Sequence, residues 1–186
     1  MMPATIASYV SVNVPTHQLM SPGFVDIVAA VLASTQGPAD WLTLEMTESM
    51  YITDGQRALM VLKDLKALGV KLALDDFGTG YSSLSYLLDF PVDIVKIDRR
   101  FVDGLGRDRA SQAIVIAIIQ LAHHLGLSVV AEGVETVGQH RVLSRLGCGF
   151  CQGFYFARPM HPANIGTLIE HRADGANQLL PTLAVT

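Results

Sequence analysis

The 186-residue sequence lacks a long, unbroken apolar run. Its most membrane-like stretch, Ala113–Ala131, is interrupted by Gln120, by two histidines and by Gly126, and it divides naturally into a helix and a strand. The amino-terminal residues MMPATIASYV also lack the basic and long apolar regions of a secretory signal peptide. We therefore expect no membrane-spanning helix and a cytoplasmic location.

Charged residues are also scarce, at 16% of the chain, and 13 Lys and Arg against 17 Asp and Glu give a formal net charge of −4. This balance predicts no general affinity for nucleic acid polymers or anionic membranes. Half of the residues are hydrophobic and the mean hydropathy is +0.37. Such an apolar composition suits a single domain whose strands are buried on both faces.

The sequence contains only two cysteines, Cys148 and Cys151, which form one CxxC pair. A redox or zinc-binding role needs more support than one pair without a second pair of ligands, so two reduced thiols near a strand are the favoured interpretation. The role of the pair is left open. The six histidines are scattered and show no HExxH pairing, which favours surface or packing positions.

Short apolar runs alternate regularly with helical patterns, and this alternation predicts an α/β fold with a parallel sheet, arranged as a TIM-like (β/α) barrel. We count six strands. They are expected at Tyr9–Val14, Trp41–Met46, Val70–Leu74, Val92–Ile97, Leu127–Ala131 and Gly149–Cys151. Helices are expected from Ser21-Pro22 to before Gly37, from Thr53 or Asp54 to Leu68, and over Ser82–Leu88, Asp108–Leu125, Thr136–Leu146 and Pro162–His171.

Polar residues follow the expected strands, and in a parallel barrel all these strand ends face one mouth. They are Asn13, Glu45, Asp75 with Asp76, Lys96 with Asp98, Glu132 and Gln152. Adjacent carboxylates such as Asp75 and Asp76 repel one another unless a cation lies nearby. Each residue alone is explained by helix capping or a surface salt bridge, but six strands that end alike favour a shared site. The set suits one or two Mg²⁺ or Mn²⁺ ions and a phosphate-bearing substrate.

These residues belong to strings that resemble, in order, the motifs of EAL domains, which are bacterial cyclic di-GMP phosphodiesterases built on a modified TIM barrel. The strings are Ser11-Val12-Asn13-Val14, Leu44-Glu45-Met46-Thr47-Glu48-Ser49, Asp75-Asp76-Phe77-Gly78-Thr79-Gly80-Tyr81-Ser82-Ser83-Leu84, Lys96-Ile97-Asp98, Ala131-Glu132-Gly133-Val134-Glu135 and Gln152-Gly153-Phe154. The resemblance runs from about Tyr9 to His171. It implies hydrolysis of cyclic di-GMP to linear pGpG by a two-metal mechanism, within bacterial second-messenger signalling.

The resemblance also implies a role for each matched residue. Asn13, Glu45 and Asp75 would hold the first metal, Asp76 would hold the second, and Glu132 would act as a base or a ligand of the second metal. Lys96 would orient or activate the water. Glu48 would brace the loop Phe77-Gly78-Thr79-Gly80, which is tied to dimer contacts in the family. Asp98, Glu135 and Gln152 would be substrate-contacting or supporting residues of the same site.

The sequence departs from the family pattern at its start. The name-giving Glu-Ala-Leu strand should precede Asn13 by some tens of residues, but Met1–Val12 contain no such motif. With about six of eight strands present, residues 1–172 resemble an amino-terminally truncated EAL domain, and residues 173–186 read as a flexible tail. We expect the open barrel to form homodimers or to self-associate in another way.

Three functions are compatible with this pattern: a phosphodiesterase or its poorly active remnant, a non-catalytic cyclic di-GMP receptor, and a protein-interaction module. Whether this chain alone is catalytically active is left open. An enolase-type barrel also uses carboxylates, a lysine and Mg²⁺, but the Asp75–Gly80 string argues against it. A dinucleotide fingerprint is weaker still, because Ser83 stands at the third glycine position.

Overall fold

The computed structural model describes residues 9–48, 50–79 and 84–166, and these residues form a six-stranded sheet in the order β1-β2-β3-β4-β5-β6. Each strand pairs in parallel with its neighbour in sequence. The strands are β1 (Val10–Asn13), β2 (Leu42–Thr47), β3 (Lys71–Phe77), β4 (Ile94–Ile97), β5 (Ser128–Ala131) and β6 (Phe150–Cys151). The sheet is a half-barrel, which confirms the predicted incomplete (β/α) barrel.

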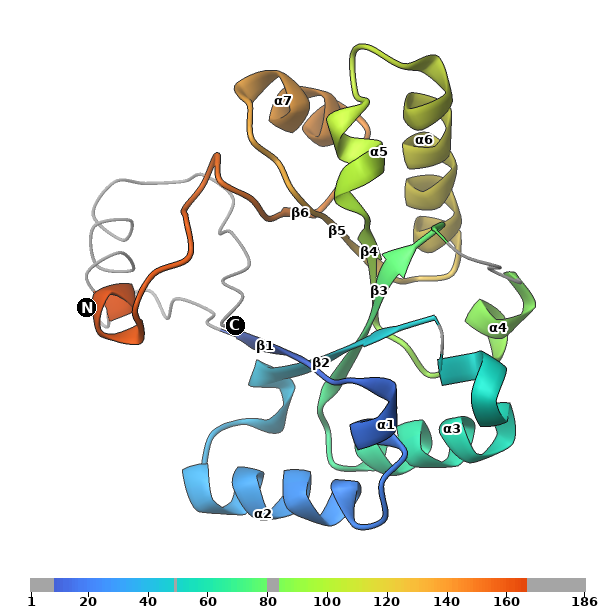
Figure 1. The fold of residues 1–186 in the computed structure, drawn as a ribbon, viewed down its shortest axis with the longest axis vertical. Coiled ribbons are helices and arrows are strands. Elements are labelled where there is room, and N and C mark those ends of the chain that lie inside the picture. The colour runs from blue at the N-terminus through green and yellow to red at the C-terminus, as the bar shows by residue number, and fades with distance from the viewer. Residues whose placement is uncertain (1–8, 49, 80–83, 167–186) are drawn as a thin grey trace.

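Helices follow the strands and lie around the outer side of the sheet, from α2 at the bottom of Figure 1 through α4 on the right to α6 and α7 at the top. They are α1 (Thr16–Leu19), α2 (Phe24–Thr35), α3 (Met50–Ala67), α4 (Leu84–Asp89), α5 (Arg99–Asp103), α6 (Arg109–His124) and α7 (Val137–Arg145). Two 3-10 helices, η1 (Ala39–Trp41) and η2 (Pro162–Asn164), complete the described elements.

Strand alternation divides the apolar residues between two faces of the sheet. Outward-facing residues such as Leu72, Leu74 and Ile97 pack with the helices in the main core. Among the described residues, the inner face carries a small separate cluster of Ala73, Ile94 and Val130. The inner face therefore has room for polar side chains, and the buried polar residues among the described ones all lie on strands of the sheet: Ser11, Thr43, Glu45 and Lys96.

Capping residues in the sequence set several helix starts. Asp108 accepts hydrogen bonds from the backbone N–H groups of Ala110 and Ser111 at the start of α6. Thr136 and Gln139 form a reciprocal capping box at the start of α7. Asp54 has a non-helical backbone inside α3, and its carboxylate accepts from the Arg57 N–H at 3.1 Å, as expected of a capping residue.

The structure differs from the expected elements at several boundaries. β3 runs on to Phe77 where the sequence predicted an end at Leu74, and the pairing register with β4 shifts between Leu74 and Phe77. The short helices α1 and α5 were not predicted. The predicted last helix begins as η2, and its end at His171, together with Gly80 and the predicted tail 173–186, lies outside the described residues.

Candidate metal centre at the strand ends

The side chain of Lys96, on β4, lies at the centre of the predicted site and is only 3% exposed. Its ammonium contacts the carboxylate of Glu45 on β2 and lies 3.2 Å from Asp75 Oδ1 on β3. It also lies 2.5 Å from Oε1 of Glu132, which directly follows β5. A lysine ammonium has three N–H donors. One donor is therefore available for each of the three carboxylates.

The same three carboxylates form a compact group. Glu45, Asp75 and Glu132 each present an oxygen atom, and these oxygens all lie within 4.8 Å of one another. Hard divalent cations such as Mg²⁺ and Mn²⁺ prefer oxygen ligands of this kind. Three carboxylates around one ammonium leave an excess of negative charge. The donor set and its charge therefore fit a divalent cation.

Burial and charge act against each other at this group. Burial lowers the pKa of Lys96, but Glu132, Glu45 and Asp75 together raise that pKa above its ordinary value, so the ammonium stays protonated. Burial raises the pKa of Glu132, and the negative charge of Asp75 adds to the effect while Lys96 opposes it. The cluster thus holds a fixed positive charge next to one buried carboxylate, Glu45, and two partly buried ones, Asp75 and Glu132.

Asp76 occupies an unusual backbone position beside this cluster. Its φ of 55° lies in the left-handed region, which non-glycine residues rarely adopt. Its N–H donates to Asp75 Oδ1 at 3.0 Å. Burial, the charge of Asp75 and a hydrogen bond to Asp98 raise the pKa of Asp76. The turn of the backbone thus sends two consecutive carboxylates to different neighbours, Asp75 to Lys96 and Asp76 to Asp98.

Other predicted residues lie around the cluster with partners of their own. Asn13 is opposite Glu45 in the β1–β2 register and is exposed. Glu48 Oε1 accepts a hydrogen bond of 3.1 Å from the Gly78 N–H. The side-chain oxygen of Gln152 is buried and has no hydrogen-bond partner in the described part of the chain. Asp98 caps α5 by accepting from the Arg100 N–H at 2.6 Å.

Arg99 is a residue of this region that the sequence patterns did not single out. Its guanidinium pairs with Glu135 at 2.7 Å, so Glu135 has a partner of its own in the structure. A Cβ atom at Gly133 would lie 2.3 Å from Arg99 Cγ, so the turn carrying Glu132 packs tightly on the arginine stem. One sequence feature could have pointed to Arg99: it directly follows Asp98, the capping residue of α5.

Both residues of the CxxC pair belong to the main hydrophobic core. Both thiols are free and buried, and the Cys148 thiol donates to the Phe150 carbonyl at 3.2 Å. The hydrogen bond to Cys151, together with burial, raises the pKa of Cys148. Free, buried and hydrogen-bonded thiols are consistent with the favoured interpretation of two reduced cysteines.

Together, the half-barrel and its acidic strand ends define an α/β domain of the kind that binds ligands at the carboxyl ends of parallel strands. A sequence model of the EAL domain family matches residues 3–159. The chain belongs to the EAL domain family. No helix in the described ranges is both long and apolar enough to cross a membrane.

Among its relatives is MucR of Pseudomonas aeruginosa, a bifunctional diguanylate cyclase/cyclic di-GMP phosphodiesterase, which is 45% identical over 81% of this chain and 22% of the relative. The solved MucR phosphodiesterase in complex with c-di-GMP has a TM-score of 0.80 and 43% identity, over 84% of this chain and 64% of that one. The chain spans about a fifth of the length of the first three curated relatives it matches.

Two further structures extend the comparison. The EAL domain of Mycobacterium smegmatis DcpA has a TM-score of 0.84 and 42% identity, and the match covers 88% of this chain and 73% of that one. Klebsiella pneumoniae BlrP1, solved with manganese and cy-diGMP, has a TM-score of 0.75 and 36% identity over 81% of this chain and 38% of that one. The BlrP1 structure supports a divalent metal in this fold.

Proposed function

We propose that this chain is a cyclic di-GMP phosphodiesterase domain that converts cyclic di-GMP to linear pGpG and uses Mg²⁺ or Mn²⁺. The observation that carries the proposal is the contact of Lys96 with Glu45, Asp75 and Glu132 at the strand ends of an EAL domain. The solved MucR phosphodiesterase in complex with c-di-GMP supports the ligand, and BlrP1 solved with manganese and cy-diGMP supports the metal.

In the proposed site, Asn13, Glu45 and Asp75 would hold one cation, and Asp76 would hold a second. When bound, such ions supply positive charge next to phosphoryl oxygens and activate a water molecule. The reaction adds one water across one phosphodiester bond. The phosphorus–oxygen bond to one ribose breaks, and the released ribose oxygen takes a proton.

The protein residues have distinct tasks in this reaction. Lys96 keeps its proton because Glu132, Glu45 and Asp75 raise its pKa, so it is a constant point charge that orients the carboxylates. Glu132, whose pKa is raised by burial, is the residue we assign to accept a proton from the attacking water. Gln152 offers a buried, unpartnered side-chain oxygen in the described structure, and it would accept a hydrogen bond from the substrate.

The isolated chain is expected to turn over slowly. In-line attack requires the water and the leaving oxygen in fixed positions, and residues that act as a unit lose far more than a proportional share of rate when the unit is incomplete. The sheet has six strands in the described residues and is open on one side. An open side admits water and lowers the rigidity of the strand ends.

The test begins with metal and ligand binding. Calorimetry should show Mn²⁺ binding to the chain, and weaker binding to Asp75→Asn, while Asp64→Asn on α3 should bind as the parent does. Titration of cyclic di-GMP at millimolar Mn²⁺ should then give a binding isotherm. Absence of both isotherms would overturn the proposal and leave a protein-interaction module as the better interpretation.

Product analysis completes the test. Chain incubated with cyclic di-GMP and Mn²⁺ should release pGpG slowly, and Asp75→Asn should release none above the blank. A version extended at its amino terminus with the Glu-Ala-Leu-containing segment of a relative should be faster by orders of magnitude. Binding of cyclic di-GMP without any pGpG in either version would contradict the enzyme and favour a receptor. Rapid hydrolysis of cyclic di-GMP by the short chain would contradict the expected slow turnover.

A further inference from the structure

Two ion pairs join the end of β4 to the turn that follows β5. The inner pair is the contact of Lys96 with Glu132 at 2.5 Å, in which the side chains are 4% and 22% exposed. The outer pair joins Arg99 Nη2 to Glu135 Oε1 at 2.7 Å, and its side chains are 53% and 39% exposed. Each partner in the outer pair stands three residues after its counterpart in the inner pair. The same two segments are therefore joined twice, once inside the domain and once at its surface.

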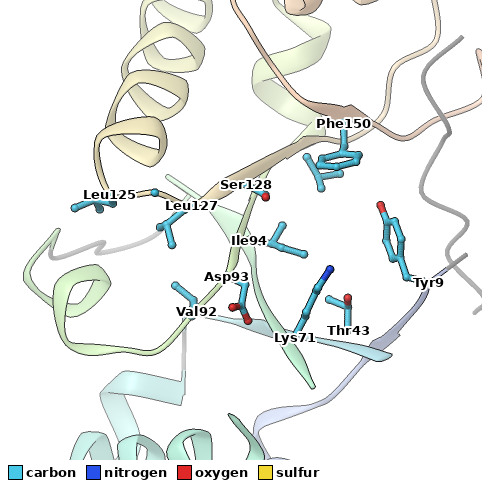
Figure 2. A pocket seen from close by; sticks show the side chains of 12 residues that line it. Tyr9, Thr43, Lys71, Val92, Asp93, Ile94, Leu125, Leu127, Ser128 and Phe150 are labelled. Atoms are coloured by element: carbon cyan, nitrogen blue, oxygen red, sulfur yellow. The ribbon is translucent and has the colours of Figure 1, made fainter. Parts of the chain in front are cut away.

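The pairing of β4 with β5 fixes the backbone that leads to the inner pair. At the amino-terminal ends of these strands, the Ser128 N–H donates to the Asp93 carbonyl at 2.9 Å. Figure 2 shows these two residues beside a cavity of about 470 Å³. At the other end, the Glu132 N–H donates to the Ile97 carbonyl at 3.1 Å. The sheet thus holds the backbone as far as Glu132, and the path of the chain beyond it depends on other contacts.

The stem of Arg99 supports the first residue beyond that point, Gly133. Gly133 has a φ of 67°, in the left-handed region, and a Cβ atom there would lie 2.3 Å from Arg99 Cγ. The same Cβ would lie 2.7 Å from Arg99 Cβ and 2.8 Å from Arg99 Cδ, so the backbone rests along the arginine stem. Glycine permits both the left-handed conformation and the close approach. The position of the turn therefore follows the position of Arg99.

The guanidinium of Arg99 holds the far end of the same turn. It pairs with Glu135, and its Nε donates to Asp103 Oδ2 at 3.2 Å, which ties it to the end of α5. A second contact with α5 lies beside the first. Gln139 donates from Nε2 to the Val102 carbonyl at 3.3 Å, and its Oε1 accepts from the Glu135 N–H at 2.9 Å. The short helix α5 is thus a bracket for the turn, and Arg99 is the part of it next to Glu132.

We propose that Arg99 is a positioning residue that holds the turn 132–135 so that the Glu132 carboxylate stays against the Lys96 ammonium. Its planar guanidinium suits this task because it presents N–H donors to two carboxylates at once. The part of the proposal that concerns catalysis rests on the proposed function, in which Glu132 accepts a proton from the attacking water. Displacement of that carboxylate would then lower kcat. KM would stay the same, because Arg99 acts through Glu132 and not on the substrate.

The first test follows the Lys96 ammonium in the full chain. NMR measures how fast its protons exchange with water, and loss of the contact with Glu132 should speed that exchange. Arg99→Ala removes both the stem and the charge and should speed it about tenfold or more. Arg99→Met keeps most of the stem and should speed it about two- to fivefold, as expected for the loss of an exposed ion pair. Arg99→Lys keeps a charge and should fall between the parent and Arg99→Met.

A double variant tests whether Arg99 acts through Glu132. Glu132→Gln itself changes the surroundings of Lys96, and Arg99→Ala added to it should cause no further change in exchange of the ammonium protons. Arg145→Ala, at an exposed arginine on α7, is the matched control and should behave as the parent does. Circular dichroism confirms that each variant is folded. Parent-like exchange in Arg99→Ala and Arg99→Met, or an equal effect of Arg99→Ala with and without Glu132→Gln, would overturn the proposal.

Kinetics separate positioning from substrate contact. With cyclic di-GMP and Mn²⁺, Arg99→Ala should lower kcat for pGpG release about tenfold or more and leave KM within about twofold of the parent. A raised KM at unchanged kcat would overturn the proposal, because Arg99 would then bind the substrate. If the parent releases no pGpG, the proposed function fails, and exchange of the Lys96 ammonium protons still decides whether Arg99 positions Glu132.

Discussion

Glu48, directly after β2, and Gly78, directly after β3, are joined by a hydrogen bond: the Gly78 N–H donates to Glu48 Oε1 at 3.1 Å. Gly78 has a φ of 90°, and a Cβ there would lie 3.3 Å from the Phe101 ring, so the chain turns tightly at this point. Asp76, two residues earlier, is also in a left-handed conformation. The Glu48 carboxylate therefore holds the turn that carries the paired acids of the site.

Removing this acceptor should loosen the turn. Glu48→Ala loses a hydrogen bond worth about 1 kcal/mol, so exchange of the Gly78 amide should become about fivefold faster. Glu48→Gln keeps an oxygen acceptor and should stay close to the parent. Hydrogen exchange followed by NMR measures both variants. Equal exchange in Ala and Gln variants would show that the contact does not restrain the turn.

Removing the ammonium of Lys96 should destabilise the whole domain in the absence of divalent ions. Lys96→Met leaves three carboxylates facing one another in a buried place, and breaking a buried ion pair in this way costs about 3–5 kcal/mol. Urea unfolding measures the change. Added Mn²⁺ should restore part of the loss, because a cation replaces the missing charge.

Lys66 provides the matched control for this substitution. Its ammonium also forms an ion pair, at 2.7 Å from Asp93, but its side chain is 31% exposed. Lys66→Met should cost about 1 kcal/mol or less and should not respond specifically to Mn²⁺. Similar losses for both lysine variants, or no rescue of Lys96→Met by Mn²⁺, would contradict the special position of Lys96.

Gly153 should tolerate no side chain. Its φ is 153°, and a Cβ there would lie 2.3 Å from both the backbone nitrogen and the oxygen of Val134. Gly153→Ala should therefore lower the unfolding free energy by more than about 3 kcal/mol, because the clash is with backbone. Gly106→Ala, where φ is 80° and no atom lies within 4 Å, should lose only about 1–2 kcal/mol. Thermal unfolding measures both variants. If Gly153→Ala and Gly106→Ala lose similar amounts of stability, the backbone of Val134 does not exclude a side chain at position 153.

The sequence predicted which side chains collect at the strand ends, because strand periodicity and terminal charges are local features. It named Glu45, Asp75, Lys96 and Glu132, and the structure brings these four together. It did not predict that Lys96 would contact all three acids, since that depends on the curvature of the sheet. The curvature sets which inner-face side chains meet, and no local pattern encodes it.

Sequence patterns also missed features that depend on unusual backbone conformations. β3 was expected to end before Asp75, because charged residues usually end buried strands, yet it continues to Phe77 through the left-handed Asp76 and a register shift. The helix α5 is only five residues long, too short for apolar periodicity to signal, although its cap Asp98 was named as a site residue. Short elements and bulges are set by tertiary contacts.

The start of α6 offers a test by pH. Hydrogen bonds from Ser111 and Ala110 lower the pKa of Asp108 below its ordinary value. Its contribution to stability is therefore fully present above the unfolded-state pKa of about 3.9 and is lost as the pH falls through the lower folded-state pKa. Asp108→Ala should be less stable than the parent at pH 7, and the difference should shrink in unfolding experiments below pH ~4.

Thr136, the cap of α7, is the control because its hydroxyl does not titrate in this range. The stability difference between the parent and Thr136→Ala should stay constant over the same pH interval. A constant difference for Asp108→Ala as well would show that the carboxylate charge contributes nothing at this cap.

The order of the sheet has a consequence for biosynthesis. Within the described sheet, each strand from β2 to β6 lies beside the strand that precedes it in the chain, so each can pair as soon as it is synthesised. A growing chain can add one strand and its covering helix at a time as they leave the ribosome, each docking on a surface already formed. Truncation from the carboxyl end would then remove whole strand–helix units, while the units synthesised earlier would keep their contacts with one another.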